Sequence, residues 1–445
     1  MKYSAEQIIA LAPDPSSAKS GRALATAGKW QNLGNDERSA WGECQGSGAK
    51  PYQNVIDLVE PAFKCSCPSR KFPCKHSLGL FLLLASNPQV FGQSSPPAWA
   101  TEWLSKRDEQ QEKKERRAAK EAETEVDEAT QARRESQRAK RALDREAKVA
   151  AGLAELELWL RDLMRAGLAT AQSRPISYWN QCAARMVDAQ APGVARRVRD
   201  LAYINQSSAD WTERLLAQLG SLFLLLKAHR QIESLPAATQ ADIRTAIGWT
   251  YKEDELPTAN VVRDEWLVLG QRVTGDETLR VHRTWLWGTR SQQAALILEF
   301  AAGGQSFLTS FISGTSVDAD LLFYPSAYPL RAALKYRYET TQSNDGVVSC
   351  AKVDQLMMTY ADGLSRNPWL ETIPVCLDSV VPVNSGERWF AKDAAQKLLP
   401  LTSQANDGWR LAALSGGHPI VIIGEWNGRS LLPLGVRADG RYVEL

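Results

Sequence analysis

Apolar residues recur at helical spacing through the middle of the chain. Spacing of three and four places side chains on one face of a helix, and such a face must be buried. The helical sets are Leu153, Leu156, Leu160 and Leu163, then Trp179, Cys182, Met186 and Val187, and finally Leu215, Leu219, Leu222, Phe223 and Leu226. Asp210 and Glu213 have the spacing of a capping box ahead of the last set. The pattern predicts a helical bundle over residues 151–256.

The pattern changes after Leu256-Pro257 to short runs typical of strands. Trp266–Leu269 and Leu279–Trp287 flank a loop at Thr274-Gly-Asp-Glu, which predicts a hairpin, and Ala295–Phe300 is the next expected strand. Pro419–Trp426 and Ser430–Val436 flank Asn427-Gly428, the strongest hairpin signal in the chain. Residues 352–372 and 387–399 are predicted to be helical. We expect an antiparallel α+β domain over 257–445.

Residues 105–150 are dominated by charge. They contain fourteen Lys or Arg and twelve Asp or Glu, but no Gly and no Pro. Oppositely charged pairs such as Glu109–Lys113 and Asp144–Lys148 lie four positions apart, which supports a solvated helix. Apolar residues are too sparse for the heptads of a coiled coil. The segment is predicted to be one long helical spacer of about 65–70 Å, at 1.5 Å per residue.

The composition is that of a multidomain globular protein, with 44% hydrophobic and 23% charged residues over 445 positions. The net charge of +2 argues against a surface built wholly for nucleic acid. The N-terminus lacks the apolar core of a signal peptide, and the apolar runs fall short of the roughly 20 residues that span a membrane. We expect a cytoplasmic protein with no membrane contact.

Four residues of metal-binding types lie within twelve positions near the N-terminus. Cys65 and Cys67 form a C-x-C pair, and Cys74 and His76 form a C-x-H pair after a gap of six residues. Thiolates and one imidazole provide the closed tetrahedral shell of a structural zinc site. The alternative of a redox pair lacks the C-x-x-C spacing of thioredoxin-like sites. The sequence therefore predicts one structural Zn²⁺ ion.

This segment resembles the SWIM zinc-finger family, whose pattern is C-x-C, a variable gap and C-x-H. All four ligand positions match, and the resemblance extends to a strand near Tyr52–Val59 and a helix near Ser77–Ala85. It implies a small treble ββα-like zinc module over residues 1–104, with the motif at 52–86. The fold class is then multidomain α+β: zinc module, long charged helix, helical bundle and β-rich C-terminal domain.

Cationic and aromatic residues surround the ligands: Lys64, Arg70, Lys71, Phe72 and Lys75. A site with three thiolates and one His carries a formal charge of −1, so some of these cations only offset it. The functional alternative is a small surface that contacts phosphates or a protein partner. Cys44 has two interpretations as well, a fifth ligand or, as we prefer, a small buried residue.

No motif of catalysis accompanies the zinc pattern. The chain lacks G-x-S-x-G, H-E-x-x-H and a phosphate-binding loop, and His229, His282 and His418 are isolated in sequence. The prediction is therefore a non-enzymatic zinc-binding adaptor in a protein complex. The family resemblance implies an AAA-type ATPase or a von Willebrand factor A-domain protein as partner. The alternatives are a DNA-binding protein that contacts phosphates through the finger, and an unrecognised hydrolase within 257–445.

The charged spacer also leads to an expectation about stability. Because it separates the zinc module from the later domains, the metal should hold only the N-terminal module together. The domains beyond residue 150 have apolar faces of their own and contribute no ligand.

Overall fold

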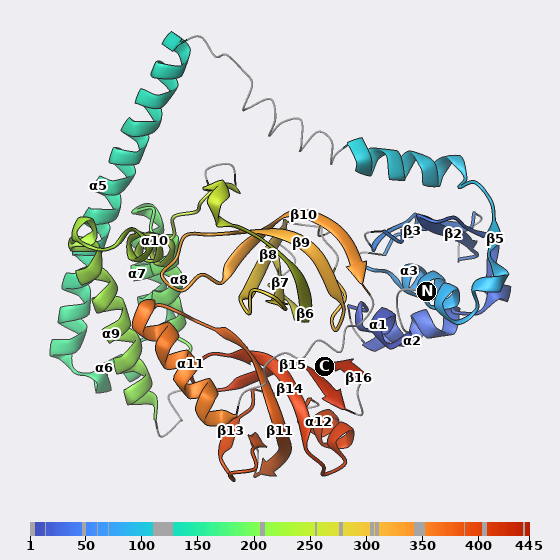
Figure 1. Ribbon diagram of the computed structural model, residues 1–445. Coiled ribbons are helices and arrows are strands. Elements are labelled where there is room, and N and C mark those ends of the chain that lie inside the picture. The colour runs from blue at the N-terminus through green and yellow to red at the C-terminus, as the bar shows by residue number, and fades with distance from the viewer. Residues whose placement is uncertain are drawn as a thin grey trace.

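The computed structural model combines three β-sheet units with a helical bundle (Figure 1). It describes residues 5–13, 15–46, 50–59, 61–69, 71–109, 128–204, 210–253, 256–275, 279–302, 307, 311–341, 352–386, 388–402, 407–438 and 441–445. Among these residues, no helix is both long and apolar enough to cross a membrane. Mixed α+β architecture is the fold class that the sequence predicted.

The N-terminal module is a five-stranded sheet in the order β4-β3-β2-β1-β5, covered by helices on both faces. Its strands are β1 (Trp30–Asn35), β2 (Ser39–Cys44), β3 (Tyr52–Asp57), β4 (Ala62–Cys65) and β5 (Gly92–Gln93). One face packs on α1 (Ala5–Ala10), α2 (Pro15–Leu24) and α3 (Lys75–Ser86). On the other, Trp41 and Val55 contact Ala100 of a helix that spans residues 98–109 (Figure 1). The strand and helix expected on either side of the ligands are β3 and α3.

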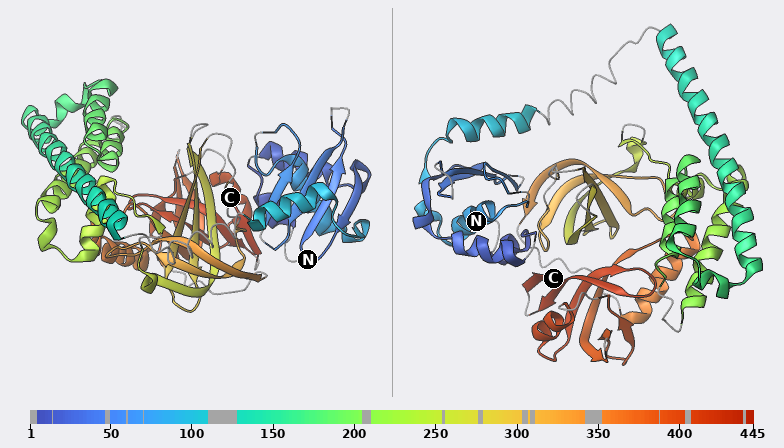
Figure 2. Two further views of the ribbon diagram at one scale, coloured as in Figure 1. Left: turned by 90° about the horizontal axis from the view of Figure 1, so that it is seen from above. Right: turned by 180° about the vertical axis from the view of Figure 1, so that it is seen from behind.

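The zinc module is packed against the later domains, which the sequence did not predict. Its core combines Ile8, Ile56 and Phe81 with Ile312, which lies beyond the bundle in sequence. Ile312 is only 2% exposed. Helix α1 also contacts the last strand of the chain (Figure 2). The expectation that only the charged segment joins the module to the rest is therefore wrong. The sequence could not show this, because the contact joins residues some 300 positions apart.

The predicted spacer helix over 105–150 is described only in part. Residues up to 109 belong to the helix on the zinc sheet, where Arg38 pairs with Asp108 and Arg107 with Asp57. Residues 110–127 lie outside the described part of the chain. Helix α5 (Glu128–Ala166) then runs through the expected boundary at 150/151. Val149 is buried in the same core as Leu153, so the bundle begins before residue 151.

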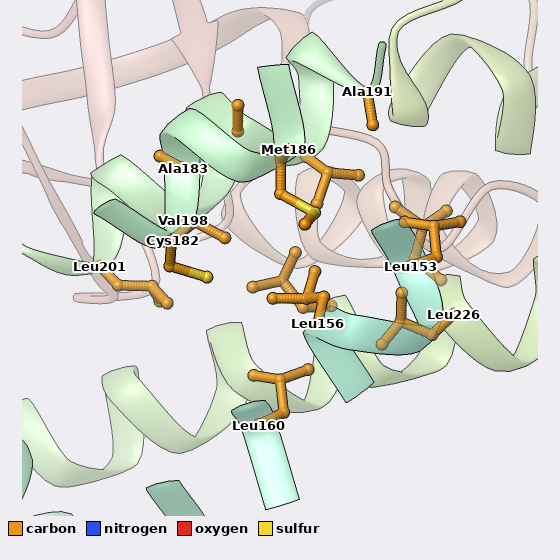
Figure 3. Close-up of a cluster of buried hydrophobic side chains, with 14 of the residues drawn as sticks. Leu153, Leu156, Leu160, Cys182, Ala183, Met186, Ala191, Val198, Leu201 and Leu226 are labelled. Atoms are coloured by element: carbon orange, nitrogen blue, oxygen red, sulfur yellow. The ribbon is translucent and has the colours of Figure 1, made fainter. Parts of the chain in front are cut away.

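The bundle is built from six helices around a core of Leu, Val, Ala and Met (Figure 3). After α5 these are α6 (Leu168–Gln172), α7 (Ile176–Asp188), α8 (Pro192–Leu201), α9 (Trp211–Arg230) and α10 (Ala237–Ile247). The three predicted apolar faces point into this core, except that Val187 is 45% exposed and lies outside it. Asp210 occupies the N-cap position of α9, but its side chain makes no capping hydrogen bond. The predicted capping box is therefore not formed.

Five strands after the bundle close into a barrel in the order β10-β8-β7-β6-β9. They are β6 (Val261–Gly275), β7 (Leu279–Gly288), β8 (Ala294–Ala302), β9 (Ser316–Phe323) and β10 (Arg331–Thr341). The predicted hairpin is β6–β7, and β8 is the expected third strand. The pairing of β8 with β10 is parallel, whereas the other barrel pairings are antiparallel. Trp266, Phe311 and Leu321 fill the interior.

The C-terminal sheet has the order β13-β12-β11-β14-β15-β16. Its elements are α11 (Val353–Arg366), β11 (Ile373–Ser385), β12 (Arg388–Lys392), β13 (Leu398–Pro400), α12 (Asp407–Ser415), β14 (Ile420–Trp426), β15 (Leu431–Ala438) and β16 (Arg441–Glu444). The hairpin predicted at Asn427-Gly428 is β14–β15. The helix predicted over 387–399 is wrong, because this segment forms β12 and β13. Trp389 and Ala391 alternate with less buried neighbours, which is the two-residue period of a strand.

Buried apolar contacts and a hydrogen bond join these units to one another. The outer face of the barrel packs on the C-terminal sheet through Leu267, Trp285 and Ile423. Trp369, between α11 and β11, inserts into the bundle core and donates a hydrogen bond to the Ser221 carbonyl at 3.3 Å. Among the described cysteines, five carry free thiols and Cys376 is disulfide-bonded.

Candidate metal centre

The four predicted ligands converge at the junction of β4 and α3. Cys65 is the last residue of β4, and Cys67 lies two residues further along the loop. Cys74 is the N-cap of α3 and His76 lies in its first turn. The peptide bond Phe72–Pro73, just before the helix, is cis. A strand end and a helix start therefore hold two ligands each.

The geometry fits a tetrahedral zinc site. The three Sγ atoms and the His76 ring nitrogen all lie within 4.8 Å of one another. His76 Nδ1 is 3.8 Å from Cys65 Sγ and 4.0 Å from Cys74 Sγ. Zn–S and Zn–N bonds of about 2.3 and 2.0 Å place tetrahedral ligand atoms roughly 3.5–3.8 Å apart. Cys65, Cys67, Cys74 and His76 are thus positioned to bind one zinc ion, with Nδ1 as the imidazole donor.

The ligand thiols shift one another's pKa values. Hydrogen bonding to Cys65 lowers the pKa of Cys74 despite the opposite effect of burial, and hydrogen bonds with His76 and Ser77 lower it further. The same hydrogen bond raises the pKa of Cys65, and burial adds to that rise. Zinc binds cysteine as the thiolate, so metal binding releases the protons of the three thiols.

A second layer of polar residues orients Cys74. The Ser77 backbone N–H donates to Cys74 Sγ at 3.5 Å, and the Ser77 Oγ lies 3.4 Å from the same sulfur. Asn54 Nδ2 on β3 donates in turn to Ser77 Oγ at 3.2 Å. Both Asn54 and Ser77 are buried. The sequence analysis did not predict this series of hydrogen bonds. The available signal was the polar Asn54, directly before the apolar Val55 and Ile56.

Aromatic packing supports the loop between the ligand pairs. Phe63 on β4 makes edge-on contacts with Phe72 and Phe81, at ring-centroid distances of 6.0 and 5.8 Å. The Tyr52 ring lies 5.0 Å from the His76 ring. Because Phe63 and Phe81 belong to the module core, the metal loop is anchored to the sheet and to α3.

The predicted contact residues divide into exposed and buried members. Lys64, Lys71 and Lys75 are exposed, whereas Phe72 is half-buried against the module core. Phe72 therefore offers little accessible ring for stacking. Arg70 lies outside the described residues. The lysines lie around the ligand loop without belonging to the ligand set.

Cys44 is not part of the ligand cluster. It is 1% exposed and lies in the apolar core of the module, where burial raises the pKa of its thiol. This is the preferred interpretation of the sequence, a small buried residue.

The other His and Cys residues that could take part in catalysis lie in different parts of the fold. His282 lies within 3.0 Å of Gln271 Oε1 in the barrel, while His418 is exposed. Cys182 is buried in the bundle core, which raises its pKa to about 11. A cavity of about 390 Å³ in the C-terminal domain has Asp378, His418 and Arg437 in its lining. This is the polar cavity on which the hydrolase alternative depends.

Comparison with known protein families identifies two segments. Residues 64–85 match the SWIM zinc finger, and residues 144–247 match the SWIM-associated four-helix bundle domain. The first match contains all four ligands, and the second covers α5 from Asp144 to the end of α10. No curated protein and no solved structure is found to match the chain.

Proposed function

Because the chain combines a SWIM zinc finger with the four-helix bundle domain that accompanies such fingers, we propose that it is a non-enzymatic adaptor in a cytoplasmic protein complex. Zinc has a structural role in this proposal. It holds the finger in a shape that presents Lys64, Lys71 and Lys75 to a partner.

The observation that carries the proposal is the closed ligand set. Catalytic zinc keeps one coordination position for water or substrate, whereas structural zinc has four protein ligands. Here four protein ligands lie in one cluster, and two of them are buried. The metal then stabilises a surface and takes no part in a reaction.

The barrel supplies a second argument, against nucleic acid as its ligand. Its strand order is that of OB-fold barrels, which bind oligonucleotides across their second and third strands. The corresponding strands here are β7 and β8. Trp285 of β7 and Leu296 of β8 pack against Ile423 of the C-terminal sheet. The chain itself occupies the surface that such barrels offer to oligonucleotides.

We propose an AAA-type ATPase or a von Willebrand factor A-domain protein as the partner, which is the association that the resemblance to the SWIM zinc-finger family implies.

Affinity capture from native lysate tests the adaptor role. The full chain is immobilised, and capture is repeated after nuclease treatment and with a Lys64→Ala, Lys71→Ala, Lys75→Ala variant. An adaptor retains a defined protein after nuclease, and the variant loses it. The matched control replaces two other exposed lysines of the module, Lys19 and Lys29. Loss of all captured protein on nuclease treatment rejects the adaptor role.

DNA binding through the finger is the second candidate. The exposure of Lys64, Lys71 and Lys75 supports it, because three exposed ammonium groups make a phosphate contact that weakens with salt. Nuclease-sensitive capture is the outcome that this candidate requires.

The hydrolase alternative rests on the cavity that contains Asp378 and His418. A panel of ester and phosphate substrates tests it, with His418→Ala as the variant. Turnover that persists in His418→Ala, or no turnover by the wild type, removes this alternative.

A further inference from the structure

The helical bundle carries a surface groove that none of the functions above uses. A cavity of about 740 Å³ lies between α5, the end of α9 and η3 (Ile232–Ser234). Its apolar lining includes Leu153, Leu226 and Ile232. Leu153 and Leu226 lie next to each other at the edge of the bundle core (Figure 3). The groove is therefore a place where the apolar core approaches the surface.

Helix α5 forms one wall of the groove with small side chains. Ala147, Ala150 and Ala154 line the cavity, and all three are exposed. Their spacing of three and four residues continues to Glu157 and Arg161, so these five positions share one helix face. Alanine has no side-chain freedom to lose and lets another backbone approach closely. This wall is suited to contact with a second helix.

A cationic cluster lies at the Glu157 end of this face. Glu157 is only 3% exposed and accepts a hydrogen bond from Arg161 at 2.8 Å. Lys227 lies 3.6 Å from the same carboxylate, and Arg230 also pairs with it. Arg161, Lys227 and Arg230 have side chains about half exposed. One carboxylate offsets one of three cations, so two positive charges remain at the surface.

The other end of the groove is close to neutral. Glu146 lies 3.8 Å from Arg244 and 4.0 Å from His229. Glu233, on η3, adds one exposed carboxylate to the opposite wall. Positive charge is therefore concentrated at the Glu157 end, where Arg230 lines the cavity and Arg161 and Lys227 contact the same carboxylate, and the apolar wall lies between the two ends. A ligand of complementary chemistry has an apolar stripe followed by acidic residues.

We propose that this groove binds an amphipathic helix of a partner protein, with its apolar stripe on Ala147, Ala150 and Ala154 and acidic residues facing Arg161, Lys227 and Arg230. The face from Glu146 to Arg161 is about 22 Å long at 1.5 Å per residue, which matches a partner helix of about 15 residues. This surface is separate from the finger, so it can bind whether or not the finger does.

A photo-crosslinker in the full-length chain tests the proposal. Benzoylphenylalanine replaces Ala150, inside the groove, or Leu158, which is 66% exposed elsewhere on α5. After irradiation in native lysate, the crosslinked peptide is identified by mass spectrometry. The expected adduct is an acidic amphipathic segment of another protein, formed at position 150 and at least tenfold weaker at position 158.

Charge reversal then tests the chemistry of recognition. Lys227→Glu with Arg230→Glu should lower the adduct yield at least tenfold, whereas Arg141→Glu with Arg199→Glu, at exposed positions outside the cluster, should leave it unchanged. If the first pair fails to fold, Ala154→Trp blocks the groove at an exposed position and should give the same loss. Four results overturn the proposal: no adduct at position 150, an adduct to nucleic acid, an adduct to a second copy of this chain, or a yield that neither the first pair nor Ala154→Trp lowers.

Discussion

The indole N–H of Trp285 donates a hydrogen bond to the Glu425 carboxylate, with 2.6 Å between Nε1 and Oε1. Arg283 donates to the same oxygen from 3.0 Å. The two donors belong to the barrel strand β7 and the acceptor to β14 of the C-terminal sheet. Glu425 is 6% exposed, so these are buried, charge-assisted hydrogen bonds between the two sheets.

Glu425→Ala should therefore destabilise the protein by about 2–4 kcal/mol. The variant removes the acceptor that the Trp285 N–H and the Arg283 guanidinium share in a buried interface, although Arg283 retains its hydrogen bond to Thr372 Oγ1. Urea unfolding followed by tryptophan fluorescence measures the loss. Glu425→Gln keeps an acceptor oxygen and should lose less; equal stability of Glu425→Ala and wild type would show that the contact contributes nothing.

Cys74→Ser should abolish stoichiometric zinc binding and accelerate amide hydrogen exchange over residues 60–80. Metal binding supplies on the order of 10 kcal/mol in finger peptides, but β3 and α3 retain apolar packing here. Because Ile312 lies in the module core, the increase should extend to the residues around Ile312 and to β16. Exchange in the bundle core should not change. Zinc retention by the variant would mean that the ligand set is wrong.

Replacing Lys64, Lys71 and Lys75 by Ala should leave zinc content and thermal stability unchanged, because all three side chains are exposed. If the finger binds DNA, the slope of log K against log salt should fall by up to about three, roughly one for each phosphate that a lysine no longer neutralises. Fluorescence anisotropy over a salt series measures this slope. An unchanged slope would place any DNA-binding surface elsewhere.

Trp369→Ala should detach the bundle from the C-terminal sheet. Truncation of a buried Trp costs about 3–5 kcal/mol, and the hydrogen bond to Ser221 disappears as well. Small-angle scattering should show a larger particle, and exchange near Ser221 should accelerate. Trp369→Phe keeps ring packing and should lose only about 1 kcal/mol with the N–H donor. A compact Trp369→Ala variant of wild-type stability would contradict this role.

Asp242→Asn should stabilise the protein at neutral pH. Burial raises the pKa of Asp242, although the Ala327 N–H donates to its carboxylate at 2.9 Å. A carboxyl with a raised pKa holds its proton more tightly when folded, so wild-type stability falls as pH rises above about 4 through the folded pKa. Asn keeps the acceptor without the charge. Urea midpoints for both proteins at pH 3.5 and 7 should differ only at the higher pH.

The sequence predicted those features that depend on residues close together in the chain, such as the zinc site and the hairpin turn. The four zinc ligands lie within twelve residues, so their spacing alone defined the site. Asn427-Gly428 predicted a hairpin because the turn itself demands those residues. The segment 387–399 was wrongly predicted to be helical. A short run with Trp389 and Ala391 fits both the helical period and the two-residue period of a strand, and only its sheet neighbours distinguish them.

Contacts between residues far apart in the chain could not be predicted from the sequence. Ile312 and Trp369 are ordinary apolar residues in their own segments, and nothing nearby indicates that one completes the zinc module and the other the bundle. The start of the bundle was missed for a related reason. Val149 is a lone apolar residue in a charged helix, and its burial depends on α7 to α9, which approach it only in the folded chain.

Ile312 packs into the module core and Trp369 into the bundle core, so buried contacts, and not the charged segment alone, hold the finger and the bundle in one arrangement. A partner that touches both surfaces would meet the second one already in place, at a high effective concentration and without the entropic loss of a flexible tether. The same rigidity selects among partners, since a ligand whose two binding segments are spaced differently gains nothing from the second surface. The barrel and the C-terminal sheet therefore determine which spacing of binding segments a partner must have.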